Sequence, residues 1–283
     1  QSFDADIQKA ISRIQPYEMT AQVIGWLRQY GIDHVNMDLM YGLPMQTTEM
    51  VIREAELTIG LKPARVALFG YAHVPWMKSH QKLINEDDLP DADERWQQFE
   101  ASSKKFIEAG YVAVGLDHFA LPDDEMSVAL DDGVLQRNFQ GYTADLAPAM
   151  IGFGASAIGQ LSQGYIQNLS PLKQYRENIA AGILPIARGI ALSDDDRLRG
   201  HIIERIMCDL TVDLDEVCEK FATSKATFVP EMEKLASLAD DAIITINGNT
   251  ITVTETGRPF VRLVAAVFDA YLDSGKGRHS RAV

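Results

Sequence analysis

The feature that most limits the possible folds is an alternation of helix-type and strand-type segments over residues 16–116. Apolar residues at helical spacing alternate with short, mostly apolar segments that end at breaker residues. The expected helices are 16–30, 47–59 and 93–109, and the expected strands are 34–40, 64–70 and 111–116. Such an order is typical of parallel strands joined by right-handed crossovers. The sequence therefore predicts an α/β fold.

Polar and breaker residues follow each of the three expected strands, in segments 38–44, 71–75 and 117–122. In parallel α/β folds, sites collect where the carboxyl ends of the strands meet. We therefore expect these three segments to share one site face.

The pattern changes in the second part of the chain, and we expect a domain boundary near residue 185. The two predicted domains are 1–185 and 186–283, the second being mainly helical. Its expected elements are helices near 194–210, 213–222 and 227–239, a hairpin turning at Asn247-Gly248, and a last helix over 256–272. This order resembles a winged helix.

Composition argues against several classes of partner. The formal net charge is −14 and no basic cluster stands out, which disfavours nucleic acid and anionic membrane surfaces. No apolar run reaches the about 18 residues that span a bilayer, and the first residues lack a signal-peptide pattern, so a cytoplasmic location is expected. Cys208 and Cys218 are interpreted as small buried apolar groups, not as part of a disulfide framework.

Asp38 is the first candidate site residue because it interrupts an otherwise apolar strand. Alternation along a strand places Asn36, Asp38 and Met40 on one face, so a ligand-binding wall is one interpretation. A structural role, as a cap or a partner of an arginine, is the other. His73 and His118 come from different strands with no metal-binding spacing, so a structural or substrate-facing role is favoured over a metal site.

A charged, aromatic loop follows at 137–143 and contains Arg137, Phe139, Gln140 and Tyr142. Aromatic rings can stack on a flat ligand, and a neighbouring guanidinium can donate two parallel hydrogen bonds to an anionic group. The loop therefore suits a flat anionic ligand. The nearby Gly152-Phe153-Gly154 would let a backbone approach a ligand, although it lacks the full pattern of a dinucleotide-binding loop.

Five motifs carry a resemblance to a known family: Asn36–Pro44, Tyr71–His73, Asp117–Ala120, Arg137–Thr143 and Arg188–Leu192. In this order they resemble the oxygen-independent coproporphyrinogen III oxidases, which are radical S-adenosylmethionine (SAM) enzymes of heme biosynthesis. The resemblance covers essentially the whole chain, and the Arg137–Thr143 motif is its most specific part. Related heme chaperones carry a tryptophan-containing segment at that place, which is absent here.

The resemblance implies a partial radical SAM (TIM-like) barrel without its first strands, followed by the winged-helix-like domain. It also implies a [4Fe-4S] cluster, two SAM molecules and the oxidative decarboxylation of two propionates of coproporphyrinogen III to vinyl groups. The implied SAM contacts are Gln1, Arg13, Asp38 and Ala72 for one molecule and Ile158 for the other. The implied cavity or substrate residues are Phe139, Gln140, Arg137, Tyr71 and His73.

The family's CxxxCxxC cluster loop has no counterpart among Cys208 and Cys218 and would lie before Gln1. We therefore expect no catalytic or metal-ligating residue in this sequence and no turnover by it alone. The expected partners are coproporphyrinogen III and an electron donor, with a monomeric full-length protein.

Two alternatives remain open at this point. The first is a non-catalytic heme chaperone or tetrapyrrole-binding relative, which would bind heme through a histidine such as His73 or His118. The second is an interaction module, in which the winged-helix-like end binds a partner through its acidic helices.

Overall fold

The computed structural model describes residues 1–272, which divide into two compact units. The first unit contains residues 1–131, and the second begins at Asp132 and contains the rest of the described chain. These two units are groups of residues that contact one another. They do not test the domain boundary expected near residue 185, which stays a prediction. None of the described helices is long and apolar enough to cross a membrane.

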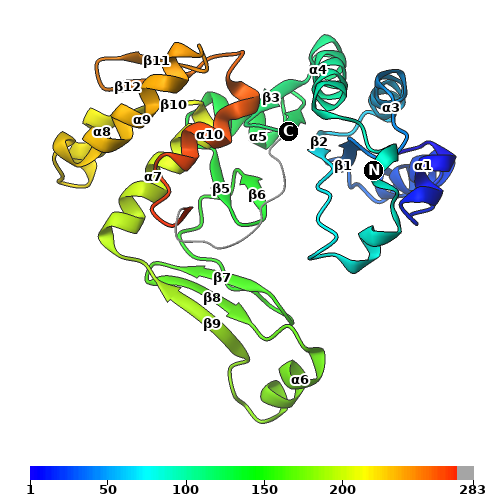
Figure 1. Cartoon of the computed structure of the whole chain (residues 1–283). Helices are drawn as coiled ribbons and strands as arrows, with labels where there is room; N and C mark the ends of the chain where they lie inside the picture. Colours follow the sequence, from blue (N-terminus) through cyan, green and yellow to red (C-terminus); the bar gives the residue numbers. More distant parts are fainter. Residues whose placement is uncertain (273–283) are drawn as a thin grey trace. The chain divides into compact units, whose positions relative to one another are not determined.

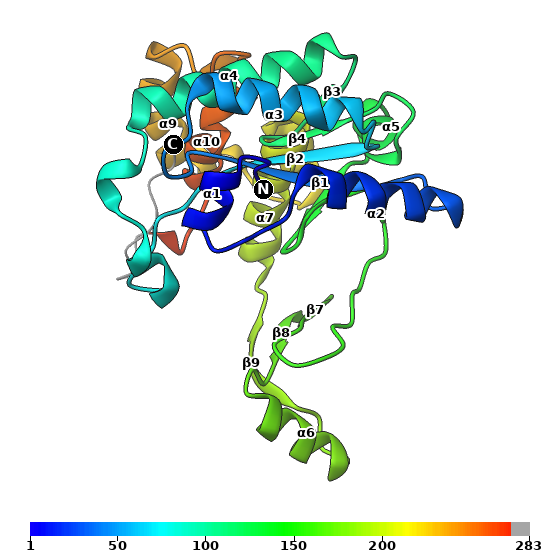
Figure 2. The ribbon, with the colours of Figure 1, turned by 90° about the vertical axis from the view of Figure 1, so that its right-hand side faces the viewer.

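The first unit is built on a four-stranded sheet whose strand order is β1-β2-β4-β3. Strands β1 (Asn36–Tyr41) and β2 (Arg65–Gly70) are parallel, and Asp38 pairs with Ala67. Helices α3 (Thr48–Gly60) and α4 (Ala92–Glu108) pack side by side over one face of this sheet (Figure 1, Figure 2). Their shared core with the sheet contains Leu39, Tyr41, Val51, Ala55, Val66, Leu68, Phe106, Tyr111 and Phe119. The α/β fold and the parallel pair are thus confirmed.

The pairing predicted for the third strand is wrong. Strand β3 (Val112–Val114) lies at the sheet edge, and a short strand β4 (His118–Ala120) comes between it and β2, antiparallel to both. Gly115 has a φ of 57°, which allows the tight reversal through residues 115–117. Because β4 runs back along the sheet, the segment 117–122 does not lie wholly at the shared site face.

Short helices complete the first unit, and local capping explains where they begin. Helix α1 (Ala5–Ala10) begins after Asp4, whose carboxylate accepts from two backbone N–H groups of its first turn. Helix α2 (Tyr17–Gln29) follows Pro16, which agrees with the helix predicted over 16–30. The remaining helical elements are η1 (Ser79–Leu83), η2 (Glu86–Asp88) and α5 (Glu125–Asp131).

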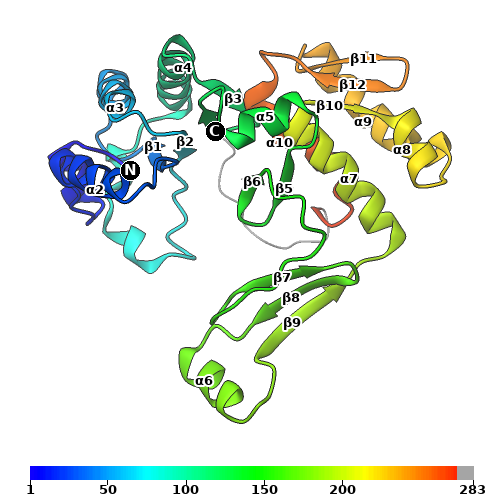
Figure 3. The same cartoon turned by 180° about the vertical axis from the view of Figure 1, so that it is seen from behind.

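The second unit begins with strands that the sequence patterns did not predict. A hairpin of β5 (Gln136–Asn138) and β6 (Gly141–Thr143) replaces the loop expected at 137–143. An antiparallel sheet follows, in the order β7-β8-β9, formed by β7 (Ile158–Leu161), β8 (Gly164–Asn168) and β9 (Ile186–Ala191). Helix α6 (Leu172–Ala180) connects β8 to β9 and lies beyond the end of that sheet, as Figure 3 shows.

The last part of the second unit follows the predicted order closely. Its helices are α7 (Asp194–Asp209), α8 (Leu214–Lys220), η3 (Lys225–Phe228) and α9 (Val229–Asp240). Its strands are β10 (Thr211–Asp213), β11 (Ile244–Asn247) and β12 (Thr250–Val253), in the order β10-β12-β11. The hairpin at Asn247-Gly248 is confirmed, with a φ of 63° at Gly248.

The last predicted helix, 256–272, is too long. A single 3₁₀ turn, η4 (Arg258–Phe260), comes first, and α10 covers only Val261–Ala266. Pro259 lacks a backbone N–H and therefore suits only the first turn of a helix.

Candidate functional site

Strand β1 separates its side chains cleanly into a buried and an exposed face. Met37, Leu39 and Tyr41 are buried, whereas Asn36 and Asp38 are exposed. This confirms the alternation predicted for the strand. The Asn36 amide donates a hydrogen bond to Asp38 Oδ1 over 2.8 Å, so one neighbour already orients the carboxylate.

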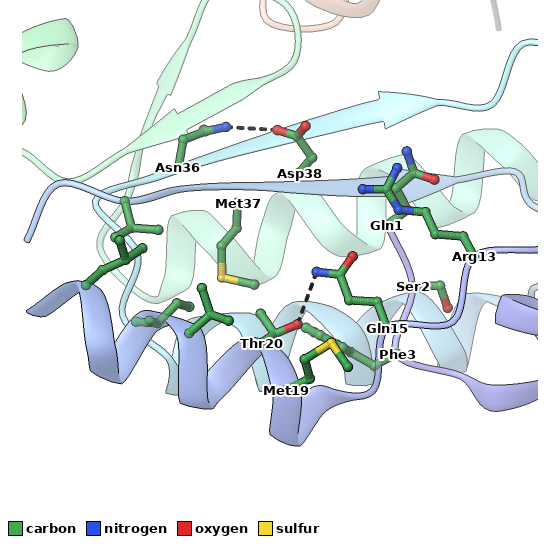
Figure 4. Close-up of a pocket in the computed structure, with 14 residues that line it drawn as sticks. Gln1, Ser2, Phe3, Arg13, Gln15, Met19, Thr20, Asn36, Met37 and Asp38 are labelled. Carbon is green, nitrogen blue, oxygen red and sulfur yellow. Dashed lines mark hydrogen bonds between the residues drawn. The ribbon is translucent and has the colours of Figure 1, made fainter. Parts of the chain in front are cut away.

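A cavity of about 360 Å³ lies along β1 and brings together three of the predicted SAM residues, Gln1, Arg13 and Asp38. We call it the β1 pocket. Figure 4 shows Asn36 and Asp38 on one side of the strand and Met37 on the other, facing α2. The apolar part of the lining is Phe3, Met19, Val23, Ile24, Leu27, Val35 and Met37.

The charges of the β1 pocket are available to a ligand. Within the described residues, the Arg13 guanidinium takes part in no hydrogen bond or ion pair, and Asp38 accepts only from Asn36. A guanidinium can bind a carboxylate with two parallel hydrogen bonds, and a carboxylate can accept from an ammonium or hydroxyl group. The pocket therefore suits a zwitterionic ligand with an apolar part.

A buried polar network supports the pocket from the side of α3. Glu54 accepts hydrogen bonds from the Ser2 hydroxyl, the Phe3 N–H (3.1 Å) and the Gln46 amide (3.0 Å). Gln46 also donates to the Met40 carbonyl over 3.0 Å. Burial raises the pKa of Glu54, and the three hydrogen bonds oppose that shift. The sequence patterns did not identify this network.

The loop after β2 contains three predicted residues, Tyr71, Ala72 and His73. Tyr71 is 7% exposed, burial raises its pKa, and its hydroxyl lies 3.2 Å from His73 Nδ1. His73 Nε2 lies 3.2 Å from Glu86 Oε1. The buried Gln81 side chain binds the loop at two points, the Ala72 carbonyl (3.0 Å) and the Val74 N–H (2.6 Å). Ala72 itself does not line the β1 pocket.

His118 has structural partners. Its Nδ1 lies 2.7 Å from Asp117 Oδ1, and its ring makes an edge contact with Phe69 at a centroid distance of 5.8 Å. Among the described residues, no group of three or more His, Cys, Asp or Glu side chains could hold a metal ion.

A second cavity, of about 370 Å³, lies on the β7-β8-β9 sheet and contains the predicted residues Phe139 and Ile158. We call it the β8–β9 pocket. Its other lining residues are Tyr165, Ile166, Gln167, Arg188, Gly189 and Ile190. Arg188 Nε donates to Gln167 Oε1 over 2.8 Å, and within residues 1–272 the guanidinium forms no ion pair. The pocket is therefore apolar with one available cation.

The other predicted residues of the 137–143 motif do not line the β8–β9 pocket. Gln140 is exposed at the hairpin turn, where its N–H donates to the Asn138 side chain. Arg137 stacks over the Tyr142 ring at 5.5 Å and lines a different cavity, next to α7. Phe139 thus lines the β8–β9 pocket, whereas Arg137 lines the cavity next to α7.

Cys208 and Cys218 are both buried and free, as the sequence predicted. Burial raises the pKa of the Cys208 thiol to about 12, so it stays protonated near neutral pH. Two buried thiols on separate helices do not fit an iron–sulfur cluster, for which the CxxxCxxC loop supplies three closely spaced thiolates.

Comparison with known proteins identifies the relatives of the chain, although no family model matches it. The oxygen-independent coproporphyrinogen III oxidase of Bradyrhizobium diazoefficiens is 47% identical over the whole chain, and that of Cereibacter sphaeroides is 42% identical. The chain is similar to this family along its whole length. It spans 63% and 62% of the lengths of these two relatives.

A solved structure agrees with this similarity. The coproporphyrinogen III oxidase HemN of Escherichia coli, described as a radical SAM enzyme, matches with a TM-score of 0.92 and 34% identity. The match covers 96% of this chain and 63% of that one. The resemblance to the coproporphyrinogen III oxidases, first seen in the five motifs, is therefore confirmed.

Arg188 is a candidate site residue that the residue-by-residue predictions missed. It lies in one of the five motifs that carry the resemblance, so the signal was present in the sequence. Its pocket could not be predicted, because the pattern around Arg188 did not indicate a strand.

Proposed function

We propose that this chain acts in the oxygen-independent oxidative decarboxylation of coproporphyrinogen III to protoporphyrinogen IX in heme biosynthesis, as an oxidoreductase of the radical SAM class that does not turn over without the family's cluster loop. The observation that carries the proposal is the β1 pocket, which joins Gln1, Arg13 and Asp38 in one cavity of a chain similar throughout to coproporphyrinogen III oxidases. The cofactors in this proposal are a [4Fe-4S] cluster and SAM, with an electron donor as a further partner.

The residues of the β1 pocket fit SAM, whose methionine part is a zwitterion. Arg13 would bind its carboxylate and Asp38 would accept from its ammonium group or from the ribose hydroxyls. When bound and reductively cleaved, SAM supplies the radical that removes a hydrogen atom from the substrate propionate. The described cysteines do not fit the cluster, so we derive no step through it.

The β8–β9 pocket is the proposed contact for the second SAM molecule and the substrate. Ile158 and Phe139 present apolar surface beside Arg188, which can bind a propionate carboxylate. Tyr71, His73, Arg137 and Gln140 remain candidates for the substrate cavity. In the same proposal, residues 1–185 form part of a radical SAM barrel, residues 186–283 form a winged-helix-like domain whose last residues, 273–283, lie outside the described chain, and the enzyme is a cytoplasmic monomer.

Replacing Asp38 by Ala tests the SAM site. We expect the Kd for SAM to rise about tenfold or more, since a hydrogen bond to a charged group contributes about 1.5–3 kcal/mol. Isothermal titration calorimetry measures the Kd, and circular dichroism checks that the fold is intact. Asp33→Ala is the matched control, because Asp33 is exposed before β1 and does not line the pocket. Unchanged SAM affinity in Asp38→Ala would contradict the proposed site.

A further inference from the structure

Glu54 is an unusual residue for the interior of the first unit. It lies on α3 with 4% exposure, and its carboxylate accepts from the Ser2 hydroxyl and the Gln46 amide as well as from the Phe3 N–H. Burying a carboxylate is costly even when it is hydrogen-bonded. Packing alone therefore does not call for a carboxylate at this position.

The bonds of Glu54 link the two chain segments that form the polar end of the β1 pocket. On one side it binds Ser2, the neighbour of the pocket residue Gln1. On the other side it binds Gln46, whose amide also donates to the Met40 carbonyl, two residues beyond Asp38. A backbone bond of 3.0 Å from the Met40 N–H to the Gln1 carbonyl closes the link.

We propose that Glu54 is a positioning residue for SAM binding: its carboxylate holds the segment of Gln1 and the end of β1 at the separation that the ligand needs. This inference rests on the proposed function of the β1 pocket. Glu54 does not line that pocket, so it acts through Gln1 and Asp38 without touching the ligand.

The decisive variant is Glu54→Met, an apolar side chain of similar length. It removes both links and leaves the Ser2 hydroxyl, the Phe3 N–H and a Gln46 N–H without this acceptor, so the melting temperature is expected to fall. The Kd for SAM is expected to rise about tenfold, because only the backbone bond from Met40 to Gln1 then ties the two walls of the pocket together. If Glu54 had a merely structural role, the same variant would melt at a lower temperature but, while folded, would bind SAM with the wild-type Kd.

Glu56→Met is the matched control on the same helix. Glu56 is exposed and pairs with Lys105 over 2.8 Å, away from the pocket, so SAM affinity is expected to stay at the wild-type value. Glu54→Gln is the second variant in case Glu54→Met does not fold. The amide of Gln keeps one acceptor oxygen, but its N–H₂ group replaces the other oxygen and faces a donor. One of the two links is therefore lost, and the Kd is expected to rise less than in Glu54→Met.

SAM binding is measured by calorimetry on the wild-type protein and the three variants, and melting by circular dichroism. Higher Kd values in Glu54→Met and Glu54→Gln, with the Glu56→Met value unchanged, support the inference. Wild-type affinity in a folded Glu54 variant overturns it and leaves the proposed function standing. If the wild-type protein binds no SAM, the proposed function of the pocket fails and this inference fails with it.

Discussion

Strands β1 and β9 are both six residues long and both contribute to a candidate site, but they are held in different ways. On β1, exposed and buried positions alternate, so the core under α3 and α4 determines which side chains face the pocket. On β9, all six positions are exposed, and the strand is held by its ladder with β8. The pocket residue Asp38 is therefore oriented by packing, whereas Arg188 is oriented by the backbone ladder and Gln167.

The largest expected effect is on the free energy of unfolding. It tests whether β1 is held by core packing and β9 is not. Phe106 on α4 is fully buried against the sheet, so Phe106→Ala should lower the free energy of unfolding by about 3–5 kcal/mol. Ile190 on β9 is 50% exposed, and Ile190→Ala should cost under about 1 kcal/mol. Urea denaturation followed by circular dichroism measures both values. Similar costs at the two positions would show that β9 has packing partners comparable to the core.

A smaller effect is expected at the turn that ends β1. Gly42 has a φ of 77°, and a Cβ there would lie 3.1 Å from Arg95 Nη1, which donates to the Tyr71 carbonyl. Gly42→Ala should therefore destabilise by about 1–2 kcal/mol, the usual cost of the left-handed region for alanine. Gly60→Ala is the control, since nothing lies within 4 Å of a Cβ at Gly60, and it should be neutral or slightly stabilising. Equal melting temperatures of the two variants would refute this account of the turn.

The smallest effect on stability, with a clear effect on binding, is expected at β9. Arg188→Ala should leave the melting temperature unchanged and raise the Kd for coproporphyrin III, the oxidised form of the substrate, about tenfold. Fluorescence quenching of the porphyrin measures the Kd. Arg176→Ala, on the exposed surface of α6, is the control and should bind like the wild type. If both variants bind equally, Arg188 does not hold a substrate carboxylate.

Much of the fold follows from local signals in the sequence. Apolar periodicity predicted β1, β2 and the helices that pack on them, and Asn247-Gly248 predicted the hairpin between β11 and β12. Strand β4 was missed because three residues carry too little periodic signal. Strand β9 was missed because it shows no burial alternation and contains Gly189, where a Cβ would lie 2.9 Å from the Tyr165 carbonyl.

The candidate site, too, was predicted in part from the sequence and completed by the structure. The sequence by itself determined the family resemblance, the exposed face of β1 and Asp38 as its polar residue, because strand alternation is a local property. The resemblance also placed Gln1, Arg13 and Asp38 at one ligand, but only the tertiary structure showed the cavity that they share and the buried Glu54 beside it. These contacts join residues up to 52 positions apart in the sequence, as Ser2 and Glu54 are, and no local pattern encodes which distant segments pack against each other.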